Sequence, residues 1–234
     1  GDAPMIVQVW RRAIEADIGR VIVACDGAEI ADIITNEGGE AVITDPDLPS
    51  GSDRVAAALA QIDPDKIYDH VINLQGDLPE MNPHMLSALS AALNTGHFDI
   101  ITQVAPLAAE EQPLEQVVKA VVSWPDGDIT QTGWALYFSR APIPHGGITD
   151  TDISATTPTE LAAMWHHVGV YGWQRAALER FITLPPSALE RTEKLEQLRA
   201  IEAGMRIGAI AVDMAITGID TESDLQAAVK RLKS

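Results

Sequence analysis

The first half of the chain alternates between two spacings of apolar residues. Ile6, Val9, Trp10 and Ala13 recur every three or four positions, a spacing that predicts a helix. Residues 21–24 are instead an unbroken apolar run, typical of a strand buried on both faces. The same alternation predicts helices around 30–34, 55–62 and 86–93 and strands at 41–43 and 71–74. The pattern therefore indicates an α/β fold with a mostly parallel sheet that carries helices on both faces.

The second half has a different pattern, in which strands follow one another with fewer helices between them. Strands are predicted at 98–105, 117–123, 135–138, 165–173 and around 208–212. A long helix is expected over 187–203, a closing helix around 221–233 and a loop over 141–163, which is rich in Pro, Gly, Thr and Asp. This half predicts a smaller, mixed α+β part beside the main sheet.

The order of elements is unusual at the start of the chain. An open parallel sheet usually begins with a strand, yet the first predicted element is a helix that Pro4 opens. We therefore expect a further segment in front of Gly1 in the complete polypeptide.

Composition and charge exclude several classes of protein. With 234 residues, 46% of them apolar, the chain can bury a core and suits one large domain. Its 34 acidic and 16 basic residues give a net charge of −18, which disfavours nucleic acid and anionic membranes as partners. The single cysteine, Cys25, excludes an internal disulfide framework, and no apolar run is long enough for a membrane span or typical of a signal peptide. A cytoplasmic protein that acts on a small molecule is expected.

Candidate chemistry follows the strand predicted at 71–74. Gln75 and Asp77 would lie at its carboxyl end, where ligands bind in open α/β sheets, and Gly76 between them permits close approach. A carboxylate in that place suits Mg²⁺, which takes one or two protein carboxylates together with substrate phosphates. A turn aspartate that bonds its own backbone is the alternative, and the segment alone favours neither.

Two further segments precede predicted helices. The segment SGSDR (50–54) would present backbone N–H groups and the Arg54 guanidinium to an anion, although ordinary N-capping by a serine is the simpler explanation. Asp220 stands just before Thr221 and Asp224, which resemble a capping box, so Asp220 is available as a second metal ligand. Taken alone, each segment is weak support for a site.

The strand predicted at 165–173 carries polar side chains. Alternation along a strand puts His167, Gly169 and Tyr171 on one face and His166 on the other, which argues against a joint histidine metal site. The glycine between two hydrogen-bonding side chains leaves room for a polyhydroxylated ligand. A half-buried structural strand fits the same pattern equally well.

Charged residues gather on the predicted long helix and on two strands. Helical spacing puts Glu190, Glu193 and Gln197 on one face, which by itself favours a solvated stripe. Lys119 and Arg140 stand out because basic residues are scarce in this chain, and an anionic substrate would need them.

Six segments together carry more information than any one of them. They are SGSDR (50–54), NLQGDLP (73–79), ALYFSRAPIP (135–144), HHVGVYGW (166–173), LERTEKLEQLR (189–199) and TGIDTESDL (217–225). In order and approximate spacing they resemble the sugar-acid cytidylyltransferases. The resemblance is greatest to the 3-deoxy-manno-octulosonate (Kdo) cytidylyltransferase family, the CMP-Kdo synthetases of lipopolysaccharide biosynthesis, and it spans nearly the whole chain.

The resemblance implies a Rossmann-like nucleotidyltransferase sheet and a role for each candidate residue. The cytidine and phosphate pocket would be lined by Ser50, Gly51, Ser52, Arg54 and Asp77. The carboxylate and hydroxyls of Kdo would be held by Gln75, Arg140, His167, Tyr171, Glu193 and Gln197. Asp77 and Asp220 would be the Mg²⁺ ligands and, with Arg54, the catalytic residues.

The resemblance also implies how the chain is divided and what it acts on. A single nucleotidyltransferase domain over 1–234 would contain a nucleotide-binding half at 1–105, a sugar-binding and dimerisation subdomain at 106–185 and a return to the main sheet at 186–234. The expected protein is a cytoplasmic homodimer that uses Mg²⁺, CTP and Kdo and releases pyrophosphate.

The N-terminus departs from the family pattern. Members of the family begin with a strand and a basic, glycine-containing loop of the type PARxxSxRLPGKPL that grips the triphosphate, and residues 1–6 match the stretch that follows it. A polypeptide that starts at Gly1 is therefore expected to be nearly inactive. The sequence is also unusual at 124–134 and after His145, which leaves the substrate contacts there open.

Other interpretations stay open. Another sugar-acid cytidylyltransferase, specific for sialic acid or 8-amino-Kdo, fits the same segments. A non-catalytic nucleotide-binding module that kept the fold and lost the loop is the alternative from a different class. A Rossmann dehydrogenase is disfavoured, because no G-x-G-x-x-G follows the first predicted strand.

Overall fold

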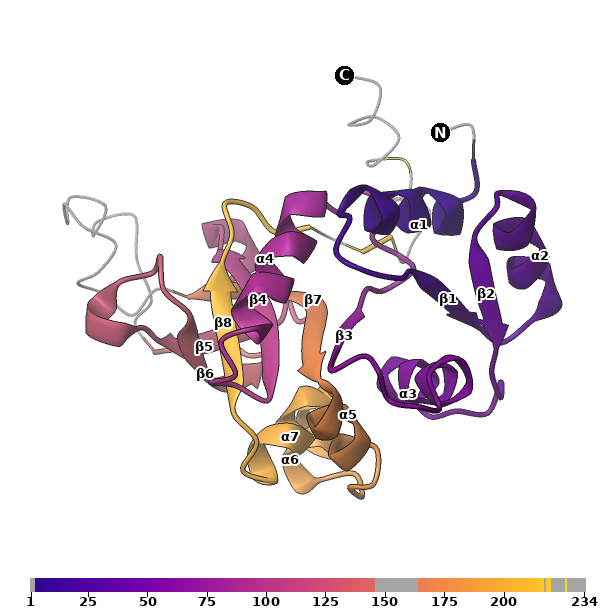
Figure 1. Ribbon diagram of the computed structural model, residues 1–234. Coiled ribbons are helices and arrows are strands. Elements are labelled where there is room, and N and C mark those ends of the chain that lie inside the picture. Colours follow the sequence, from indigo (N-terminus) through magenta and orange to yellow (C-terminus); the bar gives the residue numbers. More distant parts are fainter. Residues whose placement is uncertain (1–2, 146–163, 217, 220–225, 227–234) are drawn as a thin grey trace.

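Two sheets and the helices around them form the part of the chain that the computed structural model describes, residues 3–145, 164–216, 218–219 and 226 (Figure 1). The smaller sheet pairs β1 (Ile22–Cys25) with β2 (Glu40–Ile43) in parallel. The larger sheet has the order β3-β7-β4-β8-β6-β5. Its strands are β3 (His70–Asn73), β4 (Ile100–Pro106), β5 (Lys119–Ser123), β6 (Gly133–Ser139), β7 (Trp165–Gln174) and β8 (Ile207–Ala211).

The larger sheet closes on itself. Because β7 also pairs with β5, the strands β7, β4, β8, β6 and β5 form a five-stranded ring, and β3 is added outside it along β7. Strand β7 therefore pairs with β3, β4 and β5. Its register places Tyr171 opposite Asn73 of β3 and Thr102 of β4. This one strand connects the ring to the strand that leads to Gln75.

The expected α/β class is confirmed, but the prediction of a mostly parallel sheet is wrong. In the described part of the chain, only the β1–β2 and β4–β8 pairs are parallel, and the other pairings are antiparallel. Strands β3 and β4 do run in the same direction, since β7 is antiparallel to both. Strand β7, from the second half of the chain, lies between them.

The helices form two layers around the sheets. Helices α1 and α4 lie on one side and α3 and α5 on the other (Figure 1). The helices are α1 (Met5–Glu15), α2 (Ala28–Asn36), α3 (Gly51–Ile62), α4 (Pro83–Leu93), α5 (Arg175–Phe181), α6 (Ala188–Glu193) and α7 (Gln197–Glu202). None of the helices in the described part of the chain is both long and apolar enough to cross a membrane.

The single long helix predicted over 187–203 is wrong. Ser187 caps α6 through a capping box with Glu190, and α6 then ends at Lys194, which takes the left-handed conformation with φ of 56°. The chain turns there and begins α7 three residues later. Helix α5 was not predicted, and the closing helix expected around 221–233 lies almost entirely outside the described residues, as does most of the loop expected at 141–163.

Candidate active site

The carboxyl ends of β1, β2 and β3 meet at the first turn of α3. Arg54 Nη1 donates to Thr44 Oγ1, just after β2, at 2.7 Å, and its guanidinium lies 3.7 Å from the Asp26 carboxylate, just after β1. A Cβ added to Gly51 would lie 3.4 Å from Gln75 Oε1, so the backbone of α3 closely approaches the end of β3. The structure thus brings together Gln75, which the sequence placed at a strand end, and the 50–54 segment, which the sequence placed at a helix start.

The two serines of the 50–54 segment have different environments. Ser50 caps α3, because its Oγ accepts from Asp53 N at 3.2 Å and donates to Asp53 Oδ2 at 2.7 Å. Ser52 is fully buried and donates to Glu196 Oε1 at 2.7 Å. Capping therefore explains Ser50, whereas Ser52 connects α3 to a distant part of the chain.

Asp77 lies against the segment that contains the second predicted metal ligand. Ile219 N donates to the carbonyl of Asp77 at 3.0 Å, and a Cβ added to Gly218 would lie only 2.5 Å from Asp77 Oδ2. Gly218 and Ile219 thus contact Asp77, although about 140 residues separate them from it in the sequence. Asp220, the next residue, lies outside the described residues.

The donor set at Asp77 suits a small hard cation. Gly218 has no side chain, whereas any other residue there would crowd Asp77 Oδ2. Carboxylate oxygens such as this one are preferred ligands of Mg²⁺. Among the described residues, no group of three or more His, Cys, Asp or Glu could hold a metal. Mg²⁺ commonly takes one or two protein carboxylates, with its other ligands from substrate phosphates or water.

Arg140 and Glu193 form a second centre at the end of β6. Ser139 Oγ donates to Glu193 Oε1 at 2.8 Å, and Arg140 N donates to Glu193 Oε2 at 3.1 Å. The Arg140 side chain donates through Nε to the Glu193 carbonyl at 3.1 Å and through Nη1 to the Glu115 carbonyl at 3.0 Å. Arg140 thus donates two hydrogen bonds directly to Glu193, and the adjacent Ser139 donates a third.

Lys119, the first residue of β5, supports this centre from a buried position. Its side chain is fully buried, and Nζ donates to the carbonyl of Leu114 at 2.6 Å and to the carbonyl of Arg140 at 2.9 Å. Burial lowers the pKa of Lys119. The residue thus holds the backbone beside Arg140, whereas its scarcity in the sequence suggested a cation for an anionic substrate.

His167 is a buried neutral residue. Its Nε2 lies 3.0 Å from Thr102 Oγ1, and its ring lies edge-on to Phe138 with 4.8 Å between centroids. Thr102 has one hydroxyl proton, which it donates to the Val170 or Val168 carbonyl, so the network assigns the His167 proton to Nε2 and leaves Nδ1 as an acceptor. Burial lowers the pKa of His167 to about 3, with the neighbouring His166 adding to the effect.

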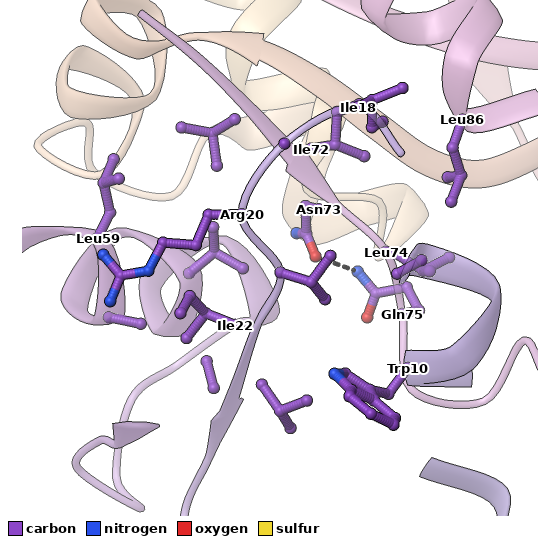
Figure 2. A pocket seen from close by; sticks show the side chains of 18 of the residues that line it. Trp10, Ile18, Arg20, Ile22, Leu59, Ile72, Asn73, Leu74, Gln75 and Leu86 are labelled. Carbon is purple, nitrogen blue, oxygen red and sulfur yellow. Dashed lines mark hydrogen bonds between the residues drawn. The ribbon is translucent and has the colours of Figure 1, made fainter. Parts of the chain in front are cut away.

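Tyr171 connects the histidine to β3. The two rings lie 5.5 Å apart, which confirms that His167 and Tyr171 are neighbours, and burial, with the nearby Glu196, holds the pKa of Tyr171 well above its usual range. Across the sheet, Tyr171 pairs with Asn73, whose Oδ1 accepts from Gln75 Nε2 at 3.2 Å (Figure 2). The predicted sugar-binding residues of β7 thus adjoin Gln75.

The prediction that Glu190, Glu193 and Gln197 share one helical face is wrong. The chain breaks its helix at Lys194, so Glu193 ends α6 and Gln197 begins α7 as a buried residue. Glu190 forms an ion pair with Arg199, and this partner, together with the Ser187 backbone, lowers the Glu190 pKa although burial opposes it.

Sequence reasoning missed Glu196, Thr102 and Asn73. Glu196 precedes α7, accepts from Ser52 and keeps Oε2 buried without a hydrogen-bond partner among the described residues. Within the charged segment 189–199 the sequence does not distinguish it from Glu190 and Glu193, and its direction depends on the helix break at Lys194. Thr102 and Asn73 sit on strands whose neighbours could not be read from the sequence.

Comparison with known proteins gives the chain its family. A family model described as cytidylyltransferase matches residues 1–207. A protein of Parvibaculum lavamentivorans named 3-deoxy-manno-octulosonate cytidylyltransferase is 48% identical over 226 residues, 96% of this chain and 81% of that protein. A protein of the same name from Bradyrhizobium sp. (strain ORS 278) is 49% identical over 230 residues, 98% of this chain and 87% of that protein. The chain belongs to the 3-deoxy-manno-octulosonate cytidylyltransferase family.

A solved structure supports the same assignment. The CMP:2-keto-3-deoxy-manno-octonic acid synthetase complexed with CTP matches with a TM-score of 0.82 and 31% identity, over 99% of this chain and 89% of that chain. The family resemblance of the six sequence segments is thereby confirmed. In this member of the family, the larger sheet is mixed and contains the closed ring of five strands.

Proposed function

We propose that the protein transfers the cytidylyl group of CTP to Kdo and so forms CMP-Kdo and pyrophosphate for lipopolysaccharide biosynthesis. One observation carries the proposal: the candidate residues lie together after the carboxyl end of β3. There the 50–54 segment approaches Gln75, and Gly218 and Ile219 contact Asp77. The relatives named 3-deoxy-manno-octulosonate cytidylyltransferase and the solved synthetase with CTP support it.

The nucleotide is assigned to the first turn of α3. Backbone N–H groups at a helix start favour phosphate, and Gly51 lets the backbone approach. Thr44 and Asp26 already hold Arg54, so its guanidinium needs little reordering to meet an anion. The nucleotide-binding residues are Ser50, Gly51, Ser52, Arg54 and Asp77.

The sugar acid is assigned to the centres at Arg140 and His167. Arg140 is the cation for the Kdo carboxylate, and neutral His167 offers Nδ1 as an acceptor for a hydroxyl. The sugar-binding residues are Gln75, Arg140, His167, Tyr171, Glu193 and Gln197. Because Gln75 lies next to both Gly51 and Asn73, it stands where the two substrates would meet.

In the proposed reaction, the anomeric 2-hydroxyl of Kdo attacks the α-phosphorus of CTP. A bond forms between this oxygen and phosphorus, the bond from phosphorus to the bridging oxygen of pyrophosphate breaks, and the hydroxyl proton is released. Both substrates are anions, so the chain's main tasks are to align them and offset their charge, which Arg54 and Arg140 do. Mg²⁺ held by Asp77 and Asp220 would supply further charge neutralisation and make a bound hydroxyl more acidic.

We further propose a cytoplasmic homodimer in which residues 1–105 bind nucleotide, 106–185 bind sugar and form the dimer, and 186–234 return to the main sheet. Support for the interface comes from β6, on which Trp134 and Leu136 are 50% and 46% exposed. Large apolar side chains in one exposed patch are typical of a protein contact.

The test is pyrophosphate release by the full-length polypeptide with CTP, Kdo and Mg²⁺. We expect turnover only when all three are present and a loss of at least about a hundredfold in Asp77→Asn. The matched control is Asp47→Asn, an exposed aspartate outside the site, which should retain turnover. Turnover with sialic acid or 8-amino-Kdo in place of Kdo would identify a different sugar acid, and CTP binding without turnover on any sugar would favour the nucleotide-binding module.

A further inference from the structure

Strands β4 and β7, which lie side by side in the larger sheet (Figure 1), pair irregularly at one point. Their register shifts after Thr102, which leaves Gly169 and Val170 of β7 without an opposite residue on β4. Extra residues of this kind bend a strand and re-aim its groups, and they are common beside active sites. The carbonyls of Val170 and Val168 here lie 2.9 Å and 3.2 Å from Thr102 Oγ1. The irregular pairing thus brings two acceptors to one buried hydroxyl.

The same hydroxyl contacts the imidazole of His167. Thr102 Oγ1 lies 3.0 Å from His167 Nε2. The hydroxyl has one proton and a carbonyl can only accept, so the proton goes to a carbonyl and Oγ1 accepts from Nε2–H. If the hydroxyl donated to Nε2 instead, both carbonyl oxygens would face an oxygen with no proton between them. The hydrogen bonds therefore run from His167 to Thr102 and from Thr102 to the backbone of β7.

Burial makes this bond decisive for the state of the imidazole. Thr102 is fully buried, and His167 is only 7% exposed. The imidazole also packs against Phe138 and Tyr171, with 4.8 Å and 5.5 Å between ring centroids. A buried N–H group normally keeps an acceptor. The surroundings of His167 therefore favour one tautomer, with the proton on Nε2, and one orientation of the imidazole.

This tautomer determines what the other ring nitrogen can bind. With the proton on Nε2, Nδ1 is an acceptor, and the lowered pKa of His167, about 3, keeps the imidazole neutral near neutral pH. A neutral imidazole with an unprotonated Nδ1 accepts a hydrogen bond from a hydroxyl but donates none to a carboxylate there. A ligand rich in hydroxyl groups suits this atom.

We propose that Thr102 is a positioning residue of the sugar-acid site, whose hydroxyl fixes the tautomer and orientation of His167 so that Nδ1 accepts from a ligand hydroxyl. The identity of the ligand rests on the proposed function, whereas the bond between Thr102 and His167 does not. Thr102 is fully buried, so it acts on the ligand through His167.

The first test follows the ring nitrogens of His167 by NMR, in the full-length polypeptide labelled with ¹⁵N-histidine and without ligand. His167→Gln identifies the signals of His167 among those of the six histidines. We expect the wild type to carry its proton on Nε2. Thr102→Val keeps the branched shape without the hydroxyl and should populate the tautomer with the proton on Nδ1, whereas Thr102→Ser should keep the wild-type pattern. A wild-type proton on Nδ1, or the wild-type pattern in Thr102→Val, would overturn the proposal.

The second test separates the two substrates by initial rates. In Thr102→Val we expect the KM for Kdo to rise at least about tenfold, while kcat and the KM for CTP change less than about threefold. Thr102→Ser should restore the KM for Kdo. The matched control is Thr95→Val, which removes an exposed hydroxyl that donates to the Ala92 carbonyl and should change no constant. Equal rises in both KM values, or no rescue by serine, would refute the positioning role.

Two further arms keep the outcomes distinct. Thr102→Ala removes the same hydroxyl without the extra methyl group and replaces Thr102→Val in both tests if that variant does not fold. Absence of turnover with Kdo in the wild type would count against the proposed function, and the NMR measurement would still decide whether Thr102 sets the tautomer of His167.

Discussion

Ser52 and Glu196 are joined by a 2.7 Å hydrogen bond although 144 positions separate them. Ser52 lies in the first turn of α3, and Glu196 lies at the corner between α6 and α7. The bond fixes the proposed nucleotide turn to the helical corner beside Tyr171, whose pKa Glu196 helps to raise. The two proposed substrate regions are thereby held at a set separation by buried side chains.

This bond predicts a coupling in stability. Ser52→Ala leaves Glu196 without its only hydroxyl donor among the described residues, so we expect a loss of about 1–3 kcal/mol in the free energy of unfolding. In a double-mutant cycle measured by urea unfolding, Ser52→Ala and Glu196→Ala should be non-additive. Ser50→Ala is the matched control, since it removes a helix cap worth about 1 kcal/mol and should be additive with Glu196→Ala. Additivity in the Ser52 cycle would contradict the coupling.

His167 predicts a loss of stability in acid. The folded chain holds its pKa at about 3, whereas an unfolded histidine titrates near 6.5, so below that pH the unfolded state binds the extra proton. Stability is therefore lost as pH falls from about 6.5 toward 3, by about 2 kcal/mol between about pH 7.5 and about pH 5. Urea unfolding of wild type and His167→Gln at both pH values should show this part of the pH dependence only in the wild type. Identical pH slopes would show that His167 is not the group responsible.

Glu193 predicts a selective effect on the sugar acid. Its carboxylate accepts from Ser139 Oγ and Arg140 N, and Glu193→Gln replaces one of those acceptor oxygens with a donor group. We expect the KM for Kdo to rise about tenfold or more while the KM for CTP changes less than about threefold. Initial rates with each substrate varied in turn measure both. Glu179→Gln, on α5, is the control and should change neither constant, and equal shifts for Kdo and CTP would place Glu193 outside the sugar site.

The buried ion pair between Asp63 and Arg175 predicts a large structural effect. The two residues are 3% and 8% exposed, and Arg175 also donates to the carbonyls of Tyr68 and Asp63. Arg175→Met would leave a buried carboxylate without its cation, at a cost of about 3–5 kcal/mol. Lys66→Met, which removes an exposed partner of Glu179, should cost less than about 1 kcal/mol. Similar losses in the two variants, measured by thermal or urea unfolding, would argue against the burial of the pair.

The sequence predicted most strands of the fold but not their neighbours. Apolar residues correctly marked β1 to β4, although among these four only β4 is buried along nearly its whole length. An apolar run contains no information on which strand lies beside it. The sequence WHHVGVYGW is compatible with any buried position, and only the folded chain shows that β7 lies between β3 and β4 and closes the ring.

The sequence singled out candidate site residues where short segments end strands or begin helices. Gln75, Asp77 and the 50–54 segment were chosen because strand ends and helix starts place ligands in open α/β folds, and the structure brings Gly51 of that segment close to Gln75. The helical face at 190–197 was predicted wrongly, since regular spacing was assumed through Lys194, where the backbone turns left-handed. Glu196 was missed for the same reason, as its inward direction depends on that break.

Strand β4 acquires both of its neighbours late in synthesis. It ends at Pro106, whereas β7 begins roughly 60 residues later and β8 roughly 100 residues later. At ribosomal speeds of about 5–20 residues per second, this apolar strand waits at least about 3–12 s for its first partner. The nascent chain therefore exposes an unpaired, aggregation-prone strand during translation. A lower growth temperature, or chaperones that bind this strand during translation, should therefore raise the yield of folded protein. Substitutions on the surface of the folded protein should raise it less.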